Sequence, residues 1–274
     1  MTIRALIAGF GLSITLCTGA LTTAYADVPG ATDAYGAFAF SSQDGGRLLV
    51  REVAGETKLK RPENIKTALC SDGQRLKIRF LHRQIERENS GRENSENFDL
   101  LEGSVFKVVG AKADPEKDCF VASEAMLAGS AVLPVKASSP PGACVQREKF
   151  AALRGRGVAQ CWPFVRLGTT AEIAFLEFTR LPNDVLASLV LSDKSRTIFK
   201  DYPAAMDDGE FTWRVEDGGE FHPKAFHIVF ALQRGDTFFI GLRWDGEGLY
   251  FTLLKSVRGS RFIEVGSGYQ YCCS

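Results

Sequence analysis

Alternation of apolar and polar residues is clearest in the second half of the chain. The stretches "AFHIVFAL" (225–232), "TFFIGLRW" (237–244), "LYFTLLKSV" (249–257) and "RFIEV" (261–265) each place apolar side chains at every second position. A period of two is typical of a β-strand with one buried face. Short Gly-containing connections such as "QRGD" and "DGEG" separate the runs, as in β-hairpins. The pattern predicts a four-stranded antiparallel meander over 225–265.

Further apolar or alternating runs lie upstream of this meander, and helices look few. We predict strands at 47–52, 75–82, 104–109, 161–167, 170–178, 196–200 and 210–215. Pro163 places its strand at a sheet edge or at a bulge, because proline cannot donate to a ladder. Residues 147–153 favour a short helix, whereas 182–191 fit either a helix or a buried strand. The fold class is therefore mainly β, an antiparallel sandwich or open barrel with one or two short helices.

Two segments interrupt the strand pattern. Residues 83–99 are rich in Glu, Asn and Arg, which predicts a long exposed loop. Residues 136–143, "KASSPPGA", read as a connector between domains. The chain then divides into a β-rich half, 27–137, and a half containing the meander, 144–274. A single domain over 27–274 fits the same pattern.

The amino-terminal residues resemble an export signal. Arg4 precedes an apolar run, and Ala24-Tyr25-Ala26 matches a small-x-small cleavage pattern. We predict a signal peptide over 1–26, with Cys17 in the removed part, and a periplasmic or secreted location. After cleavage no stretch approaches the ~18 apolar residues that a transmembrane segment needs.

Removal of Cys17 leaves six cysteines, an even number that predicts a disulfide-stapled fold in an oxidising compartment. They are Cys70, Cys119, Cys144, Cys161, Cys272 and Cys273. Adjacent Cα atoms lie about 3.8 Å apart, below the ~4.4–6.8 Å of a relaxed disulfide. We therefore expect Cys272 and Cys273 to bond two different distant cysteines. No Cys-x-x-Cys is present, which argues against a zinc or thioredoxin-type site.

Charge is balanced overall but unevenly distributed. Lys plus Arg and Asp plus Glu each total 33, so the chain is no general nucleic-acid binder. Residues 47–92 hold twelve Lys or Arg against six acids, whereas 201–220 hold seven acids against one Arg. Within the basic stretch, Arg75, Lys77 and Arg79 alternate with apolar residues and form one cationic strand face. This face could bind an acidic protein or an envelope polymer. Alternatively, it is simply solvated or faces the acidic stretch of the same molecule.

Candidate catalytic residues are sparse. The nucleophile-elbow, zincin, P-loop and EF-hand patterns are missing. Glu220, His222 and His227 lie close in sequence, but strand spacing does not put both histidines on one face. The acidic stretch offers carboxylates for a hydrolase or a calcium ion, namely Asp207, Asp208, Glu210, Glu216 and Glu220. We expect no cofactor.

These observations favour an exported protein that acts by surface binding rather than catalysis. Its partner would be another secreted protein, as for an inhibitor or immunity protein, or an envelope polymer. A structural envelope component fits equally. The alternative is a secreted hydrolase that uses carboxylates of 201–220.

Overall fold

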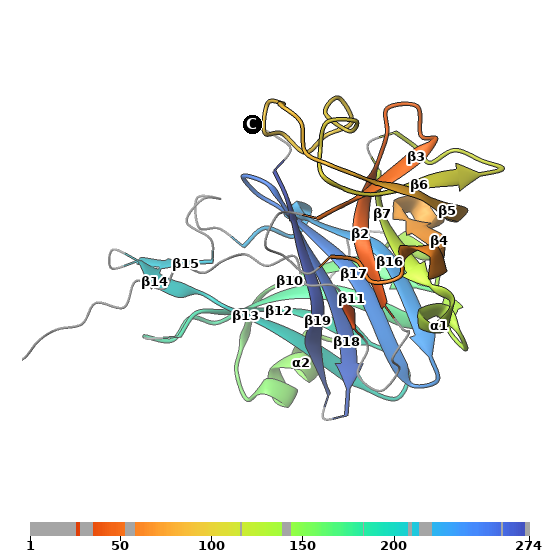
Figure 1. The fold of residues 1–274 in the computed structure, drawn as a ribbon. Helices are drawn as coiled ribbons and strands as arrows, with labels where there is room; N and C mark the ends of the chain where they lie inside the picture. The colour runs from red at the N-terminus through yellow and green to blue at the C-terminus, as the bar shows by residue number, and fades with distance from the viewer. Residues whose placement is uncertain are drawn as a thin grey trace, which may run out of the picture.

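Strands dominate the computed structural model, which describes residues 26–27, 35–52, 58–115, 117–138, 144–182, 184–207, 210–213, 221–258 and 260–271. Two large antiparallel arrangements lie against each other, with a small hairpin, β14 (Ala205–Asp207) and β15 (Glu210–Thr212), at one side (Figure 1). Within the described ranges the helices are α1 (Glu124–Leu127) and α2 (Arg147–Arg154). The mainly-β prediction is confirmed.

The first arrangement is a closed six-stranded barrel, which we call the N-terminal barrel. Its sheet consists of β1 (Ala26–Asp27), β2 (Tyr35–Ser41), β3 (Arg47–Arg51), β4 (Ile65–Cys70), β5 (Arg75–Gln84), β6 (Gly103–Val109) and β7 (Asp118–Ser123). The strand order is β1-β2-β3-β6-β5-β4-β7. Pairing of β2 with β7 closes a ring of six strands, and β1 lies outside this ring, paired with β2. Leu48, Ile65, Ile78, Phe106 and Val121 fill the interior.

The second arrangement is a curled ten-stranded sheet. It contains β8 (Ala131–Val132), β9 (Val135–Ala137), β10 (Val158–Leu167), β11 (Ala171–Phe178), β12 (Leu186–Ser192), β13 (Thr197–Pro203), β16 (Phe226–Arg234), β17 (Thr237–Asp245), β18 (Leu249–Val257) and β19 (Arg261–Gln270). Two antiparallel meanders, β10–β13 and β16–β19, meet at a parallel bridge between Phe199 and Arg261. At the two far edges, β8 pairs with β16 and β9 pairs with β10. Because β8 and β9 are consecutive in sequence, residues 131–137 link both edges.

The predicted C-terminal meander is confirmed as β16–β19. However, β19 continues to Gln270, beyond the predicted end of the meander at Val265. The helix alternative for 182–191 is wrong: this stretch forms β12, which is buried on both faces. The helix expected at 147–153 is α2, and Gly155 ends it in the left-handed conformation (φ 60°). The register shifts between Pro163 and Val165, which confirms the bulge expected there.

Aromatic side chains join the two arrangements. Phe120 of β7 lies 5.1 Å from Phe38 of β2 and 4.7 Å from Phe230 of β16, measured between ring centroids. Phe38 also stacks on Phe251 of β18 at 4.9 Å. These rings belong to one buried cluster that contains residues of both the barrel and the curled sheet. Burial between the two β structures, rather than a covalent bridge, therefore holds them together.

Each described disulfide lies within one half of the molecule. Cys70 and Cys119 face each other on neighbouring strands β4 and β7. Cys144, just before α2, is bonded to Cys161 of β10. The expectation that Cys272 and Cys273 bond two of these four cysteines is wrong, because the four pair with one another. Cys272 and Cys273 themselves, like residues 1–25 of the expected signal peptide, lie outside the described residues.

The segment after β5 is not the fully exposed loop that its composition predicts. Within residues 85–102, which we call the outer loop, Phe98 and Leu101 are buried against Phe40 and Leu49 on the outside of the barrel. The Gln84 side-chain amide donates to the carbonyl oxygens of Phe98 and Leu101, both at 2.6 Å. Two apolar residues at the end of a polar stretch, together with these hydrogen bonds, therefore dock it on the barrel.

Candidate functional site

The cationic face predicted on β5 exists. Along Arg75–Phe80 the side chains alternate between exposed cations and apolar groups, with Leu76 and Ile78 buried in the barrel interior. Lys107 of the neighbouring strand β6 lies directly opposite Arg79 in the register. Residues two apart on a strand are separated by about 7 Å, and directly opposed residues by about 5 Å. Arg75, Lys77, Arg79 and Lys107 thus form a compact surface patch, which we call the cationic face.

The four cations of this face have no ion-pair partner among the described residues. Other cations of the barrel are paired: Arg47 with Asp99 at 2.5 Å, Arg51 with Glu93 at 2.7 Å, and Lys58 with Glu102 at 3.2 Å. Arg47 is the register partner of Lys107, so paired charge begins where the cationic face ends. Like charges directly opposed across a sheet are destabilising. The Arg79–Lys107 pair is therefore a position where a bound anion would stabilise the protein.

The described part of the acidic stretch, residues 201–207 and 210–213, does not cover this face. The hairpin β14–β15 projects from the curled sheet on the side opposite β5 (Figure 1). Asp207 and Glu210 are paired across this hairpin, whereas Asp208, Glu216 and Glu220 lie outside the described residues. The carboxylate hydrolase and the calcium site therefore remain predictions.

The two histidines have separate partners. His222 Nδ1 accepts a hydrogen bond from the Lys224 backbone N–H at 3.2 Å. His227 Nε2 lies 3.1 Å from Asp245 Oδ2. Among the described residues no group of three His, Cys, Asp or Glu side chains could hold a metal ion.

His227 stands at the end of a chain of charges that the sequence did not reveal. Arg243 of β17 bonds Asp245 at 2.6 Å and also Asp118 of the barrel strand β7. Burial raises the pKa of Asp118 by more than Arg243 lowers it. Burial also raises the pKa of Asp245, but the bonds to His227 and Arg243 outweigh this and hold its pKa below the ordinary value. In the part of the chain that the structure describes, no hydroxyl or thiol is bonded to His227. The chain of charges therefore acts as a tie between the two β structures.

Lys107 is the member of the cationic face that sequence reasoning missed. Its signal was present, because a lone lysine interrupts the apolar run "SVFKVV" (104–109). Only the pairing of β5 with β6, however, places it beside Arg79.

Comparisons with known proteins add no relative. No protein-family model, no curated protein and no solved structure matches this chain. Neither described helix is long and apolar enough to cross a membrane. The described disulfides are consistent with an oxidising, extracytoplasmic compartment.

Proposed function

We propose that this is an exported, non-catalytic binding protein that recognises an acidic partner through the cationic face. The observation that carries the proposal is the set of four clustered cations without a described counter-charge. Such a face attracts an anionic surface and increases the rate of encounter. The partner is an acidic secreted protein, as for an inhibitor or immunity protein, or an anionic envelope polymer.

The rigidity of the surface supports this role. The cationic face lies on two central strands of a closed barrel, whose backbone is fixed by hydrogen bonds on both sides. A preorganised charged surface loses less conformational entropy on binding than a flexible one. Val109, which is 38% exposed and opposite Lys77, adds an apolar contact within the patch.

Affinity capture from the native exported fraction tests the proposal. The bait is the full mature chain, compared with a variant that carries Arg75→Gln, Lys77→Gln, Arg79→Gln and Lys107→Gln. A control variant changes two arginines and two lysines that are also exposed but lie outside the cationic face, namely Arg258, Arg261, Lys60 and Lys149. We expect an acidic protein or polymer to be retained by the wild type and the control, to elute with salt, and to be lost from the four-site variant.

Equal retention by all three baits would show that the cationic face is not the binding surface. Capture of nothing acidic by the wild type would count against the function itself. Circular dichroism of the four-site variant checks that its barrel is folded.

The export step has its own test. Cleavage of the signal peptide after Ala26 predicts a mature protein that begins at Asp27. Intact mass measurement of the exported protein checks this, and a mass that still includes residues 1–26 would contradict it.

A further inference from the structure

A row of five polar side chains crosses the curled sheet far from the cationic face. The register pairs Lys136 with Arg166, Arg166 with Glu172, Glu172 with Ser192 and Ser192 with Thr197. Residues that are directly opposed on neighbouring strands point to the same face of a sheet. The row thus lies on one face, the outer face of strands β9 to β13.

The same outer face is covered farther along by α2. Phe150 of α2 is buried among Val190 of β12 and Phe199 of β13, and the Cys144–Cys161 disulfide fixes the segment that leads into the helix. The cover ends at the first turn of α2, and a cleft begins there. Its open, polar end has a volume of about 500 Å³ and includes Lys136, Arg166, Glu172 and Ser192. An adjoining space of about 100 Å³ runs beneath the first turn of α2 and shares Ser192 and Glu172.

Two hydroxyl groups of the row are buried without a hydrogen-bond partner among the residues that the structure describes. Ser192 and Thr197 are only 6% and 5% exposed, and neither Ser192 Oγ nor Thr197 Oγ1 is bonded. Ser188, on the same face of the same strand, shows the ordinary arrangement, because its hydroxyl donates to Asp201 Oδ1 at 2.6 Å. Buried hydroxyls almost always find a partner in folded proteins. An unpartnered one that lines a cleft is suited to bind a ligand.

The charges of the cleft indicate which ligand. Lys136, Arg166 and Lys194 line it, and none of them has an ion pair within the described ranges. The carboxylate of Asp193 is already occupied by the Ser195 hydroxyl and by Arg196. Glu172 is then the unoccupied carboxylate of the cleft, next to the hydroxyl of Ser192.

We propose that this cleft binds an acidic monosaccharide unit. Its acid group would lie between Lys136 and Arg166, because charge-assisted hydrogen bonds to a guanidinium and an ammonium are strong. Its ring hydroxyls would donate to Glu172 and exchange hydrogen bonds with Ser192, so that each of the four residues of the row that line the cleft would have a partner. A simple anion would satisfy the cations but would provide no hydroxyl group for Glu172.

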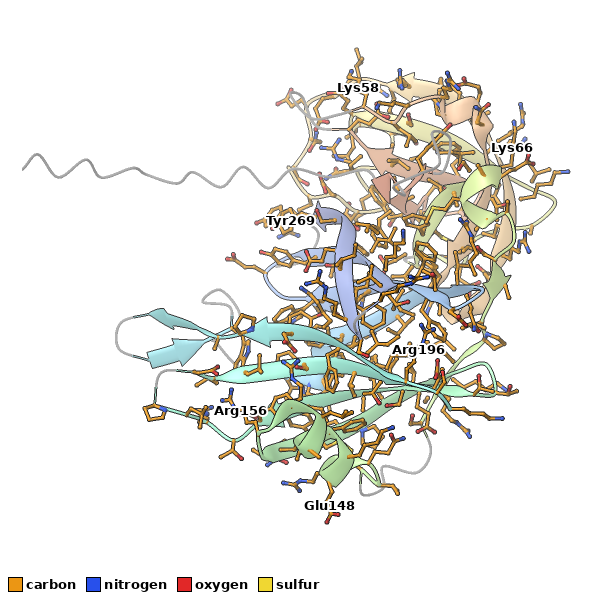
Figure 2. All side chains as sticks on the ribbon, turned by 90° about the horizontal axis from the view of Figure 1, so that it is seen from below. Lys58, Lys66, Glu148, Arg156, Arg196 and Tyr269 are labelled. Atoms are coloured by element: carbon orange, nitrogen blue, oxygen red, sulfur yellow. A yellow bond between two sulfur atoms is a disulfide. The ribbon has the colours of Figure 1, made fainter. Side chains whose placement is uncertain are left out.

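This proposal does not depend on the cationic face. Figure 2 shows Lys66 on β4 of the barrel and Glu148 on α2 at opposite ends of the molecule. A negative result in the sugar-binding test therefore does not contradict the proposed function. A negative result in affinity capture likewise does not contradict the proposed sugar site.

Isothermal titration calorimetry of the full mature chain tests the cleft, with glucuronate as the probe and glucose and inorganic phosphate as comparators. We expect saturable binding of glucuronate at one site and weaker binding of glucose and phosphate. Arg166→Gln should weaken glucuronate binding about tenfold, the loss expected for a charge-assisted hydrogen bond. Arg261→Gln, on an exposed position of β19 with no ion pair to any described residue, is the matched control and should leave affinity unchanged.

A pair of serine variants separates ligand binding from folding. Ser192→Ala should lower affinity for glucuronate without lowering the melting temperature, since its hydroxyl has no partner in the described part of the chain. Ser188→Ala should lower the melting temperature without changing affinity, since it loses the bond to Asp201. Absence of saturable glucuronate binding would overturn the proposal. Phosphate binding as tight as glucuronate would overturn the assignment to a sugar, and a fall in melting temperature alone for Ser192→Ala would show that the hydroxyl is structural.

Discussion

Each of the two β structures has a segment packed on its outside, and the two segments are held by different means. The outer loop on the N-terminal barrel is held by Phe98 and Leu101, by ion pairs of Arg51 with Glu86 and Glu93, and by hydrogen bonds from Gln84. α2 on the curled sheet is held by Phe150 and by a disulfide. Apolar anchors and ion pairs thus act in both, since Arg154 of α2 also pairs with Asp201 of β13, whereas among the described residues a disulfide secures only the second cover.

The sequence predicted the helix α2, but it did not predict that the outer loop packs on the barrel. α2 shows helical spacing and a glycine stop. The outer loop has a composition typical of an exposed segment, because its polar residues bind one another and the barrel instead of water. Composition alone does not distinguish a charge-rich loop that docks from one that does not.

Removing the apolar anchor of the outer loop should have the largest effect on stability. Phe98 is 1% exposed and packs against Phe40, with Arg47 4.9 Å from its ring. We expect Phe98→Ala to lower the free energy of unfolding by about 3–5 kcal/mol, as for other buried phenylalanines. Urea denaturation measures this. Proteolysis should then cut within residues 85–102 of the variant, and a loss below ~1 kcal/mol would mean that the ion pairs hold the loop without Phe98.

Removing the covalent anchor of α2 should have a smaller effect. The Cys144–Cys161 disulfide joins residues 17 apart in sequence, for which loop closure accounts for about 3 kcal/mol. We expect the double variant Cys144→Ser, Cys161→Ser to lose about this much in urea denaturation.

The second disulfide provides the comparison. Cys70 and Cys119 are 49 residues apart, which predicts a loss of about 4 kcal/mol for the corresponding double serine variant. If the barrel disulfide proved much the less important of the two, the loop-closure account would fail for this protein. The backbone pairing of β4 with β7, which already holds Cys70 and Cys119 together, would then explain why the barrel disulfide adds little stability.

The smallest expected effect is the pH dependence of stability that comes from the ion pairs of Arg51 with Glu93 and Glu86. It is also the most diagnostic effect. Burial raises the pKa of Glu93 above its usual 4.5 by more than Arg51 lowers it. Glu93 therefore contributes stability at pH below 4.5, and this contribution is lost as the pH rises through the raised pKa. Relative to the wild type, Glu93→Gln should gain stability as the pH rises from about 3 to about 7.

Glu86, which also pairs with Arg51, should behave in the opposite way. Burial raises its pKa, but bonds from the Glu102 backbone N–H, Asn89 and Arg51 together hold it below the ordinary value. Its contribution is present above 4.5 and is lost as the pH falls. Relative to the wild type, Glu86→Gln should therefore lose stability as the pH rises. Urea denaturation at several pH values measures both variants, and slopes of the same sign would contradict this assignment.

The sequence pattern predicted strands with one solvated face, such as β5, and also β16 and β17, which are largely buried on both faces. The missed strands β2, β4 and β7, with sequences "YGAFAFS", "IKTALC" and "DCFVAS", are largely buried on both faces. Their outer side packs against the curled sheet, so no polar residue marks every second position. The same reason left 182–191 undecided between helix and strand.

The candidate sites divide in a similar way. Arg75, Lys77 and Arg79 are visible in the sequence because they lie on one strand. Lys107 and the row from Lys136 to Thr197 depend on strand pairings across the sheet, which a single sequence does not specify. The cysteine pairing was likewise inaccessible, since six cysteines permit many connectivities.

The short segment 131–137, which joins β8 to β9, has a consequence for assembly. The outermost long strands of a large sheet would offer their backbone to a strand from another molecule and so promote aggregation. Here β8 occupies the edge of β16 and β9 occupies the edge of β10, and Leu133 N–H donates to the Ala231 carbonyl at 2.9 Å. Where these pairings exist, a second chain could add a strand to β16 or β10 only by displacing this segment. The segment 131–137 thus also protects these parts of the two edges against edge-to-edge polymerisation.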